Sequence, residues 1–262
     1  MRDQIASFAR RRLRVPVGPD ALVLDVGSGD KPHWRADVLV DLYPDASSPA
    51  QRPGAPRARV DRPLFVADAS SLPFATGAFD HVICSHVLEH VADPARVIAE
   101  LTRVARSGYL EVPQAASAKI LDFPSHLWWC RLVDGVLVLR AKQAGDVDPE
   151  VAEYIAASGI ERSLARLLDS RFDRRVISLP WQGAIPHRVE GRLDPALAAA
   201  ASDAPRHTGA WTSSAHLLTS GLAMARRARR RVLRRSVRFD DVVAPEHRRG
   251  NGEVLRRGIY RL

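Results

Sequence analysis

The sequence predicts an α/β fold in which a mostly parallel sheet is covered by helices on both faces. Short apolar runs recur along the first half of the chain, and helical patterns or long connections separate them. Several of these runs end in an acid or in a glycine turn. Strands joined by such crossovers pair in parallel, and a parallel sheet needs cover on both faces.

The strands and helices of the first half can be assigned in chain order. Residues 3–14 have the periodicity of an amphipathic helix. Strands are expected at residues 21–26, 36–41, 64–68, 79–85 and 108–113. Residues 44–63 are rich in Pro, Ala and Arg, which predicts an exposed loop. Asp93-Pro94 predicts the start of a helix that continues to about residue 106.

The second half predicts additions to this sheet. Residues 128–140 have the pattern of a β-hairpin that turns at Asp134-Gly135. Further elements are expected as a helical segment at 149–170, a strand at 175–181 that pairs near 185–191, and a basic helix at roughly 215–236. The expected organisation is a domain over residues 1–191, a low-complexity linker over 192–214 and a basic C-terminal extension over 215–262.

Composition indicates a folded protein of a reducing compartment. Of the 262 residues, 46% are hydrophobic, and the formal net charge is +9. No apolar run approaches the ~18 to 20 residues that span a bilayer, and the N-terminal segment lacks the apolar stretch of a secretory signal. Cys84 and Cys130 are too few for a disulfide framework and form no CxxC pair. We therefore expect a cytoplasmic protein with both thiols packed as small hydrophobic side chains.

Acids and glycines gather where the predicted strands end. Asp25-Val-Gly-Ser-Gly29 would form the floor of a ligand site, because glycine lets main-chain amides approach a ligand closely. Asp41 would accept hydrogen bonds from ribose hydroxyls, and Asp68 with Ala69 would meet a base. Ser85 would face the reacting end of a cofactor. Ligands of open α/β sheets bind beyond the carboxyl ends of the strands, where these residues are expected.

Five motifs in order strengthen this interpretation: Leu22-Val-Leu-Asp-Val-Gly-Ser-Gly29, Val38-Leu-Val-Asp41, Ala67-Asp-Ala69, Leu72-Pro-Phe74 followed by Phe79-Asp80, and His86-Val-Leu-Glu-His90. In this set the sequence resembles the class I S-adenosylmethionine-dependent methyltransferases, especially the subgroup related to the ubiquinone-biosynthesis methyltransferase. The resemblance covers roughly residues 20–113 and implies a Rossmann-like fold with S-adenosylmethionine as the cofactor.

The resemblance also implies roles for single residues. The glycine turn would contact the methionine end of the cofactor, Asp41 the ribose, and Asp68 with Ala69 the adenine. The expected cofactor-binding residues are Asp25, Gly27, Ser28, Gly29, Asp41, Leu42, Asp68, Ala69 and Ser85. One departure concerns the first crossover, because Gly27 and Asp41 are only 14 positions apart. The helix between them must be very short or absent, and residues 30–34 would then join the rim of the pocket.

His86, His126 and Asp122 are candidates for a catalytic base. His86 follows the fourth strand, and His126 lies with Asp122 in an aromatic segment where a substrate lid would sit. A base is needed only if the acceptor is protonated at the working pH, and His126 has the alternative role of anchoring the hairpin. His86 and His90 have the spacing of a metal-binding pair, but no third ligand is evident in the sequence, so no metal is expected.

The leading hypothesis is methyl transfer from S-adenosylmethionine to an oxygen, nitrogen or carbon of a small molecule. A methyltransferase-fold protein that binds a cofactor or partner without catalysis is the second hypothesis. A third is an RNA-directed enzyme that uses the arginine-rich C-terminal helix. Ser85-His86 stands where base-methylating enzymes carry an Asn-Pro-Pro-Tyr-like signature, so nucleic acid is not the expected partner. The basic helix at 215–238 either packs on the domain or touches an anionic membrane.

Overall fold

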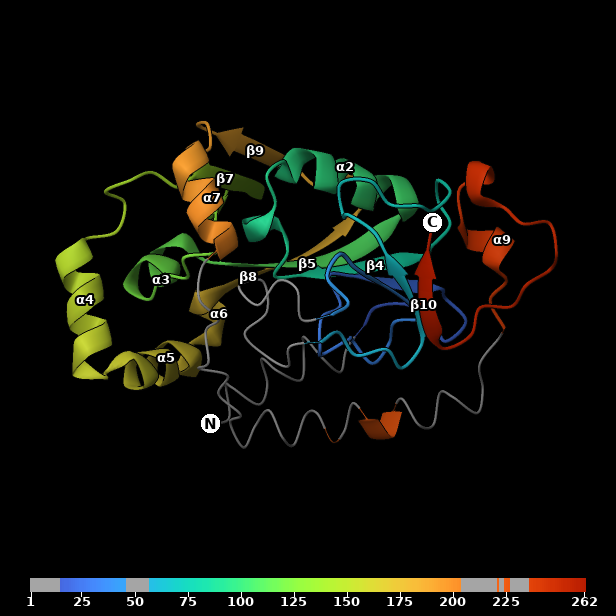
Figure 1. The fold of residues 1–262 in the computed structure, drawn as a ribbon, viewed down its shortest axis with the longest axis horizontal. Helices are drawn as coiled ribbons and strands as arrows, with labels where there is room; N and C mark the ends of the chain where they lie inside the picture. Colours follow the sequence, from blue (N-terminus) through green and yellow to red (C-terminus); the bar gives the residue numbers. More distant parts are fainter. Residues whose placement is uncertain (1–14, 46–56, 204–220, 222–223, 227–235) are drawn as a thin grey trace.

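The computed structural model describes residues 15–45, 57–203, 221, 224–226 and 236–262 (Figure 1). The helix expected at residues 3–14 and most of the basic helix expected at 215–238 lie outside these ranges. The main sheet has seven strands in the order β10-β3-β2-β1-β4-β5-β8. Every pairing in it is parallel except that between β5 and β8, which confirms the predicted α/β class with a mostly parallel sheet.

The bounds of the elements follow the chain in order. The main sheet consists of β1 (Val23–Val26), β2 (Val38–Asp41), β3 (Pro63–Val66), β4 (His81–Ser85), β5 (Ser107–Pro113), β8 (Val176–Gln182) and β10 (Gly258–Arg261). A second sheet consists of β6 (Trp128–Val133), β7 (Val136–Ala141) and β9 (His187–Glu190). The helices are η2 (Leu88–His90), α2 (Pro94–Val104), α3 (Ala115–Ile120), α4 (Pro149–Ser158), α5 (Glu161–Ser170), α6 (Phe172–Arg175), α7 (Pro195–Asp203), α9 (Phe239–Val242) and η3 (Pro245–His247).

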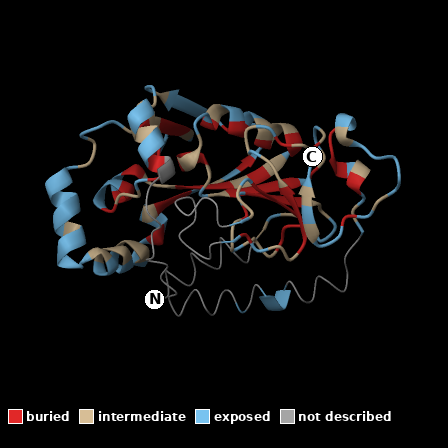
Figure 2. Cartoon of the chain, in the orientation of Figure 1, coloured by how far each residue is buried: buried red, intermediate tan, exposed pale blue. Residues whose placement is uncertain are grey.

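Alternation along the strands divides the core between the two faces of the main sheet. On one face, Leu24 and Val26 of β1 belong to the large cluster that also contains the apolar stripe of α2. On the other face, Val23 belongs to a smaller cluster with Leu39 and Ile83. Figure 2 shows the strands of this sheet as the most buried part of the molecule, whereas α4 and α5 are largely exposed.

Local sequence signals placed two of the predicted elements well. The Asp93 side chain accepts a hydrogen bond from the Arg96 amide at 3.0 Å and caps α2, with Pro94 at its first position. The hairpin of β6 and β7 turns at Asp134 and Gly135, which both have positive φ, as a tight two-residue turn requires. Both cysteines are buried and unpaired by disulfide, as expected.

Three predicted features differ from the structure. The strand expected at 175–181 does not pair with residues 185–191, because β8 pairs with β5 and β9 pairs with β7. Within the segment expected as a linker, residues 195–203 form α7, where Asp194 caps the first turn by accepting from the Ala196 amide at 2.8 Å. The loop expected to be exposed at 44–63 contains Arg62, whose side chain is buried and donates to the carbonyls of His33 and Ala36.

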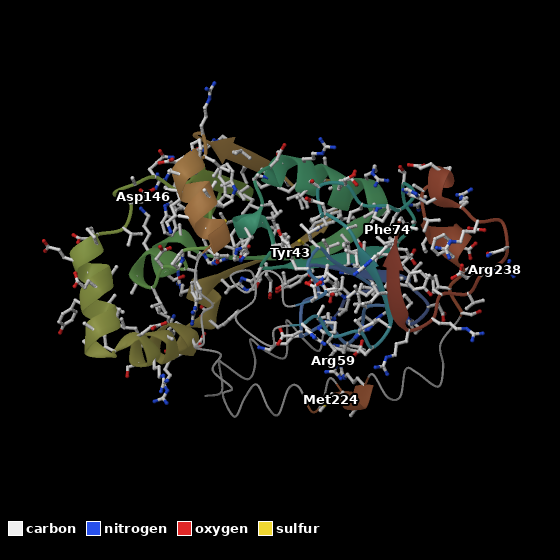
Figure 3. All side chains as sticks on the ribbon, in the orientation of Figure 1. Tyr43, Arg59, Phe74, Asp146, Met224 and Arg238 are labelled. Carbon is white, nitrogen blue, oxygen red and sulfur yellow. The ribbon has the colours of Figure 1, made fainter. Side chains whose placement is uncertain are left out.

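The C-terminal residues take part in the core and do not stand apart from it. Strand β10 extends the main sheet by pairing in parallel with β3. Phe239 and Val242 of α9 are fully buried, and the Phe239 ring lies 6.1 Å from that of Phe65. Figure 3 shows Phe74 on the side of the molecule that carries α9 and β10, with Asp146 at the opposite end. Residues 239–262 therefore complete one end of the main sheet, although the domain predicted from the sequence ended at residue 191.

No helix among the described residues is long and apolar enough to cross a membrane.

Candidate functional site

A cavity of about 540 Å³ lies at the carboxyl ends of the central strands. All nine residues expected to bind a cofactor line it: Asp25, Gly27, Ser28, Gly29, Asp41, Leu42, Asp68, Ala69 and Ser85. A volume of this size is typical of small-molecule and cofactor pockets. The fold thus brings together the residues that the sequence assigned to one ligand.

The turn after β1 forms one wall of this cavity. Gly27 and Gly29 both have positive φ, and the amides of Gly27 and Ser28 donate to the carbonyl of Val40 in β2. A Cβ on Gly27 would collide with the Val87 side chain, so backbone conformation and space both demand glycine here. The buried Ser28 hydroxyl has no hydrogen-bond partner among the described residues, which leaves a polar group free for a ligand in this wall.

Two buried acids, Asp25 of β1 and Asp41 of β2, bind backbone amides around the glycine turn. The Asp25 carboxylate accepts from the His33 amide at 2.7 Å. The Asp41 carboxylate accepts from the amides of Gly29 and Tyr43, at 2.8 and 2.9 Å. Each carboxylate oxygen has a second lone pair, so both acids can also accept from a bound ligand. Asp41 therefore links the glycine turn to the end of β2, in addition to the ribose contact expected of it.

The crossover between β1 and β2 contains no helix, as its short length predicts, but Trp34 of the expected rim does not line the cavity. Residues 27–37, all within the described part of the chain, contain no helix. Asp30, Lys31 and His33 line the cavity in its place. The buried Arg62 side chain supports this segment by donating hydrogen bonds to the carbonyls of His33 and Ala36, at 2.7 and 2.6 Å. The rim is thus built from a loop that a buried guanidinium holds.

The sequence analysis missed a hydrogen-bonded group on the opposite wall. Tyr109 and Glu111 of β5 both line the cavity, and the Glu111 carboxylate accepts from the hydroxyls of Tyr109 and Ser85. Glu111 lies directly opposite Ser85 in the sheet register and is 3% exposed. The available signal was an acid in an otherwise apolar strand, two positions after a tyrosine, which puts both side chains on one face.

His86 lies at the end of β4 and lines the same cavity. Its φ is +57°, a conformation that residues other than glycine adopt rarely and that is enriched at functional sites. The Nδ1 atom of His86 donates to the Glu89 carboxylate at 2.9 Å. Burial alone would raise the pKa of Glu89, but the hydrogen bond from His86 and the neighbouring histidines lower it to about 2. Glu89 is therefore ionised and orients the His86 ring.

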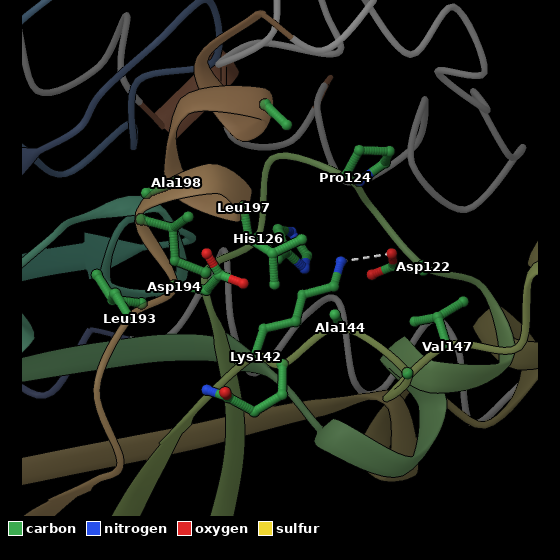
Figure 4. Close-up of a pocket in the computed structure, with 14 residues that line it drawn as sticks. Asp122, Pro124, His126, Lys142, Ala144, Val147, Leu193, Asp194, Leu197 and Ala198 are labelled. Carbon is green, nitrogen blue, oxygen red and sulfur yellow. Dashed lines mark hydrogen bonds and ion pairs between the residues drawn. The ribbon is translucent and has the colours of Figure 1, made fainter.

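His126, the other candidate base, lies elsewhere. It lines a second cavity of about 250 Å³ together with Asp122, Lys142 and residues of α7 (Figure 4). Burial lowers the pKa of His126 to about 3, so the ring is neutral. Asp122 is paired with Lys142. The His126 ring lies 4.9 Å from that of His90, which lines the larger cavity, so these two imidazoles stand where the two cavities approach each other.

Known proteins that are similar to this chain include methyltransferases. Residues 24–110 match the model of a family described as "Methyltransferase domain". A "Demethylmenaquinone methyltransferase" of Roseiflexus castenholzii is 34% identical over 146 residues, which cover 52% of this chain and 58% of the relative. An "Uncharacterized methyltransferase" of Mycobacterium sp. strain KMS is 39% identical over 97 residues, covering 34% of this chain and 36% of the relative. The chain thus spans little more than half of these relatives, or less.

Among solved structures, one similar chain belongs to a complex between the Haloferax volcanii Trm112 methyltransferase activator and a methyltransferase. It is 16% identical, with a TM-score of 0.40, and the match covers 71% of this chain and 95% of that chain.

Proposed function

We propose that this chain transfers a methyl group from S-adenosylmethionine to a small-molecule acceptor, as a member of the class I S-adenosylmethionine-dependent methyltransferases. The match of residues 24–110 to a methyltransferase-domain model and the similarity to named methyltransferases support this proposal. The observation that carries the proposal is the convergence of nine motif residues on one cavity. That cavity offers the parts that the cofactor needs, which are a glycine turn, two buried carboxylates and an unpaired hydroxyl.

The proposed arrangement places the methionine end of the cofactor on Gly27, Ser28 and Gly29. The ribose hydroxyls then donate to Asp41, and the adenine lies against Asp68 and Ala69. Bound in this way, S-adenosylmethionine supplies an electrophilic methyl group on a sulfonium. The protein contributes chiefly by holding the acceptor in line with that methyl group, an effect worth about 7–11 kcal/mol in favourable cases.

His86 is the better candidate for a general base. It lines the cofactor cavity, whereas His126 lines the other one. Because Nδ1 of His86 donates to Glu89, the proton of a neutral imidazole is fixed on that nitrogen and Nε2 is left to accept one. Glu89 then holds the ring orientation, as an acid does for a catalytic histidine in hydrolases. An acceptor hydroxyl within reach of Nε2 would lose its proton as the methyl group transfers.

The relatives suggest which acceptors to try first. Four similar relatives are named demethylmenaquinone methyltransferases, so a hydroxylated aromatic ring is the first class of acceptor to test. The cavity carries hydroxyl and carboxylate groups from Ser85, Tyr109 and Glu111, which suit an acceptor with several oxygens.

The experiment is a transfer assay with S-adenosylmethionine labelled on the methyl group. The full chain is incubated with a panel of phenols, quinols and amines, and separately with RNA. Label in a small-molecule product supports the proposal, and His86→Gln should then slow transfer about 100-fold or more with cofactor binding retained. Label in RNA alone, or none with any acceptor while the cofactor is bound, would argue for the RNA-directed or the non-catalytic alternative.

The basic helix expected at 215–238 offers a route to membrane-bound acceptors. Most of it lies outside the described residues, but the Arg226 guanidinium lies 5.8 Å from the centroid of the Trp34 ring. Sedimentation with neutral and anionic vesicles tests this part of the proposal. Binding to anionic vesicles that weakens with salt supports a peripheral membrane contact, and equal recovery in the supernatant with both vesicle types contradicts it.

A further inference from the structure

A cluster of three potential metal ligands lies between the two cavities. Glu89 and His90 come from η2, and His126 comes from the loop before β6. One carboxylate oxygen and one nitrogen from each imidazole lie within 4.8 Å of one another. The sequence pointed to His86 and His90 as a pair without a third ligand. The fold supplies the third position from residue 126, and His86 turns instead to the Glu89 carboxylate.

Two polar atoms of the cluster have no hydrogen-bond partner among the described residues. Glu89 is fully buried, and its Oε2 atom has no hydrogen-bond partner within the described parts of the chain. The Nδ1 atom of His126, which is 7% exposed, has none there either. A buried polar atom without a hydrogen-bond partner is costly in free energy. A bound cation would satisfy both atoms at once.

The orientation of His90 is that of a metal ligand. Its Nδ1 atom donates to the Ser125 carbonyl at 3.0 Å, which leaves the lone pair on Nε2. A hydrogen bond from the remaining ring nitrogen to a carbonyl or carboxylate is the usual support of a metal-binding histidine. The bond from His86 to Glu89 supports the carboxylate in the same way.

The backbone keeps the two ligand-bearing segments together. The Leu127 amide donates to the Glu89 carbonyl at 2.7 Å, and the Trp128 indole donates to the Val91 carbonyl at 2.8 Å. Phe123 stacks on the His126 ring at 5.1 Å between centroids. Ligand atoms around tetrahedral zinc lie about 3.4 Å apart when each is ~2.1 Å from the ion. Any two of the three ligand atoms, which lie within 4.8 Å of each other, would therefore need to approach by no more than about 1.4 Å to bind one ion.

We propose that Glu89, His90 and His126 bind a divalent first-row transition-metal ion, with zinc the best match to two imidazoles and one carboxylate. Three protein ligands leave a fourth position for water or another oxygen, as in zinc sites that are not purely structural. Lys142 shares a cavity with His126, but its ion pair with Asp122 balances its charge. The inference rests on the contacts of this cluster and does not depend on the proposed function.

Calorimetry with zinc chloride on the chelator-treated full chain tests the site. We expect one equivalent to bind tightly, and Glu89→Gln and His126→Gln each to weaken the affinity about 100-fold or more. His187→Gln, which removes an exposed imidazole from β9, serves as the matched control and should bind as the unmodified chain does. Undiminished affinity in both cluster variants, or no stoichiometric binding by the unmodified chain, would overturn the inference.

Two further measurements keep the test decisive if a cluster variant does not fold. Cobalt bound to the unmodified chain should show the visible absorption bands of a low-coordinate site without a thiolate charge-transfer band. A thiolate band would assign the ion to Cys84 or Cys130 and contradict the proposal. The double variant His207→Gln/His216→Gln should retain full affinity, and loss of binding in it would place the ion on histidines outside the described residues instead.

Discussion

Gly27 is the residue at which backbone conformation and cavity shape constrain the sequence most tightly. Its φ is +70°, and a Cβ there would collide with Val87. Gly77 has nearly the same φ, +66°, but nothing lies within 4 Å of the position that its Cβ would occupy. An alanine at Gly77 would bear only the free-energy cost of the left-handed conformation, whereas an alanine at Gly27 would also collide with Val87.

We predict that Gly27→Ala weakens S-adenosylmethionine binding at least tenfold, because the turn must shift away from Val87. Gly77→Ala should lower the free energy of unfolding by about 1–2 kcal/mol, the usual cost of this conformation for alanine, and leave cofactor affinity unchanged. Calorimetry and urea unfolding of the two variants measure both effects. Equal cofactor affinity in the two would contradict the assignment of this turn.

His81, which does not line the larger cavity, makes the free energy of unfolding depend on pH. Burial, and to a lesser extent Arg35, lowers the pKa of His81 from 6.5 to about 4 in the folded chain. Between these pH values the unfolded chain binds a proton that the folded chain does not, so stability falls as the pH decreases from 6.5 to 4. The slope from this group is at most about 1.4 kcal/mol per pH unit. His81→Gln should show a smaller slope in urea unfolding, and an unchanged slope would refute the attribution.

At the scale of secondary-structure elements, β8 depends on one glycine in its neighbour. Gly108 of β5 lies opposite Trp181 of β8, and a Cβ on Gly108 would run into the buried indole ring. We predict that Gly108→Ala lowers the free energy of unfolding by about 1–3 kcal/mol through overpacking. Gly18, which has nothing within 4 Å of its Cβ position, is the control and should change stability little. Tryptophan fluorescence and urea unfolding report both, and equal stability of the two variants would contradict the packing described.

The elements that the sequence predicted well are those with local signals. Buried apolar runs located β1 to β5, and a capping acid followed by proline located α2. Helix α7 was missed because its alanine run has no periodic polar face, although alanine has the highest helix propensity. Strand β10 has four residues and none of them is buried, so its pairing with β3 depends on contacts that no local pattern announces.

In the candidate site too, the residues that the sequence predicted are those with a local signal. Residues near strand ends, such as Asp25 and Ser85, follow from motif order and parallel topology. The pairing of Glu111 with Ser85 follows from strand register, and the approach of His126 to His90 follows from the path of a loop. Neither of these is encoded in the spacing of residues along the chain.

At the scale of the whole molecule, the C-terminal residues complete the fold. Phe239 is fully buried, its ring is 6.0 Å from that of Tyr260, and the Arg249 guanidinium lies 4.3 Å above it. We predict that Phe239→Ala lowers the free energy of unfolding by about 3–5 kcal/mol. Tyr154→Ala, at an α4 residue that is 65% exposed, should change it by less than about 0.5 kcal/mol. A small effect of Phe239→Ala in urea unfolding would mean that residues 239–262 form a separate extension.

The most direct test of the cofactor site is calorimetry of the full chain with S-adenosylmethionine and with its demethylated product. We predict that each ligand binds with one equivalent, and that Asp41→Ala weakens both about tenfold or more through loss of a charged hydrogen bond and of the anchor of Gly29. No heat of binding with either ligand would contradict the central claim. Binding that Asp41→Ala leaves unchanged would show that the cofactor lies elsewhere in the molecule.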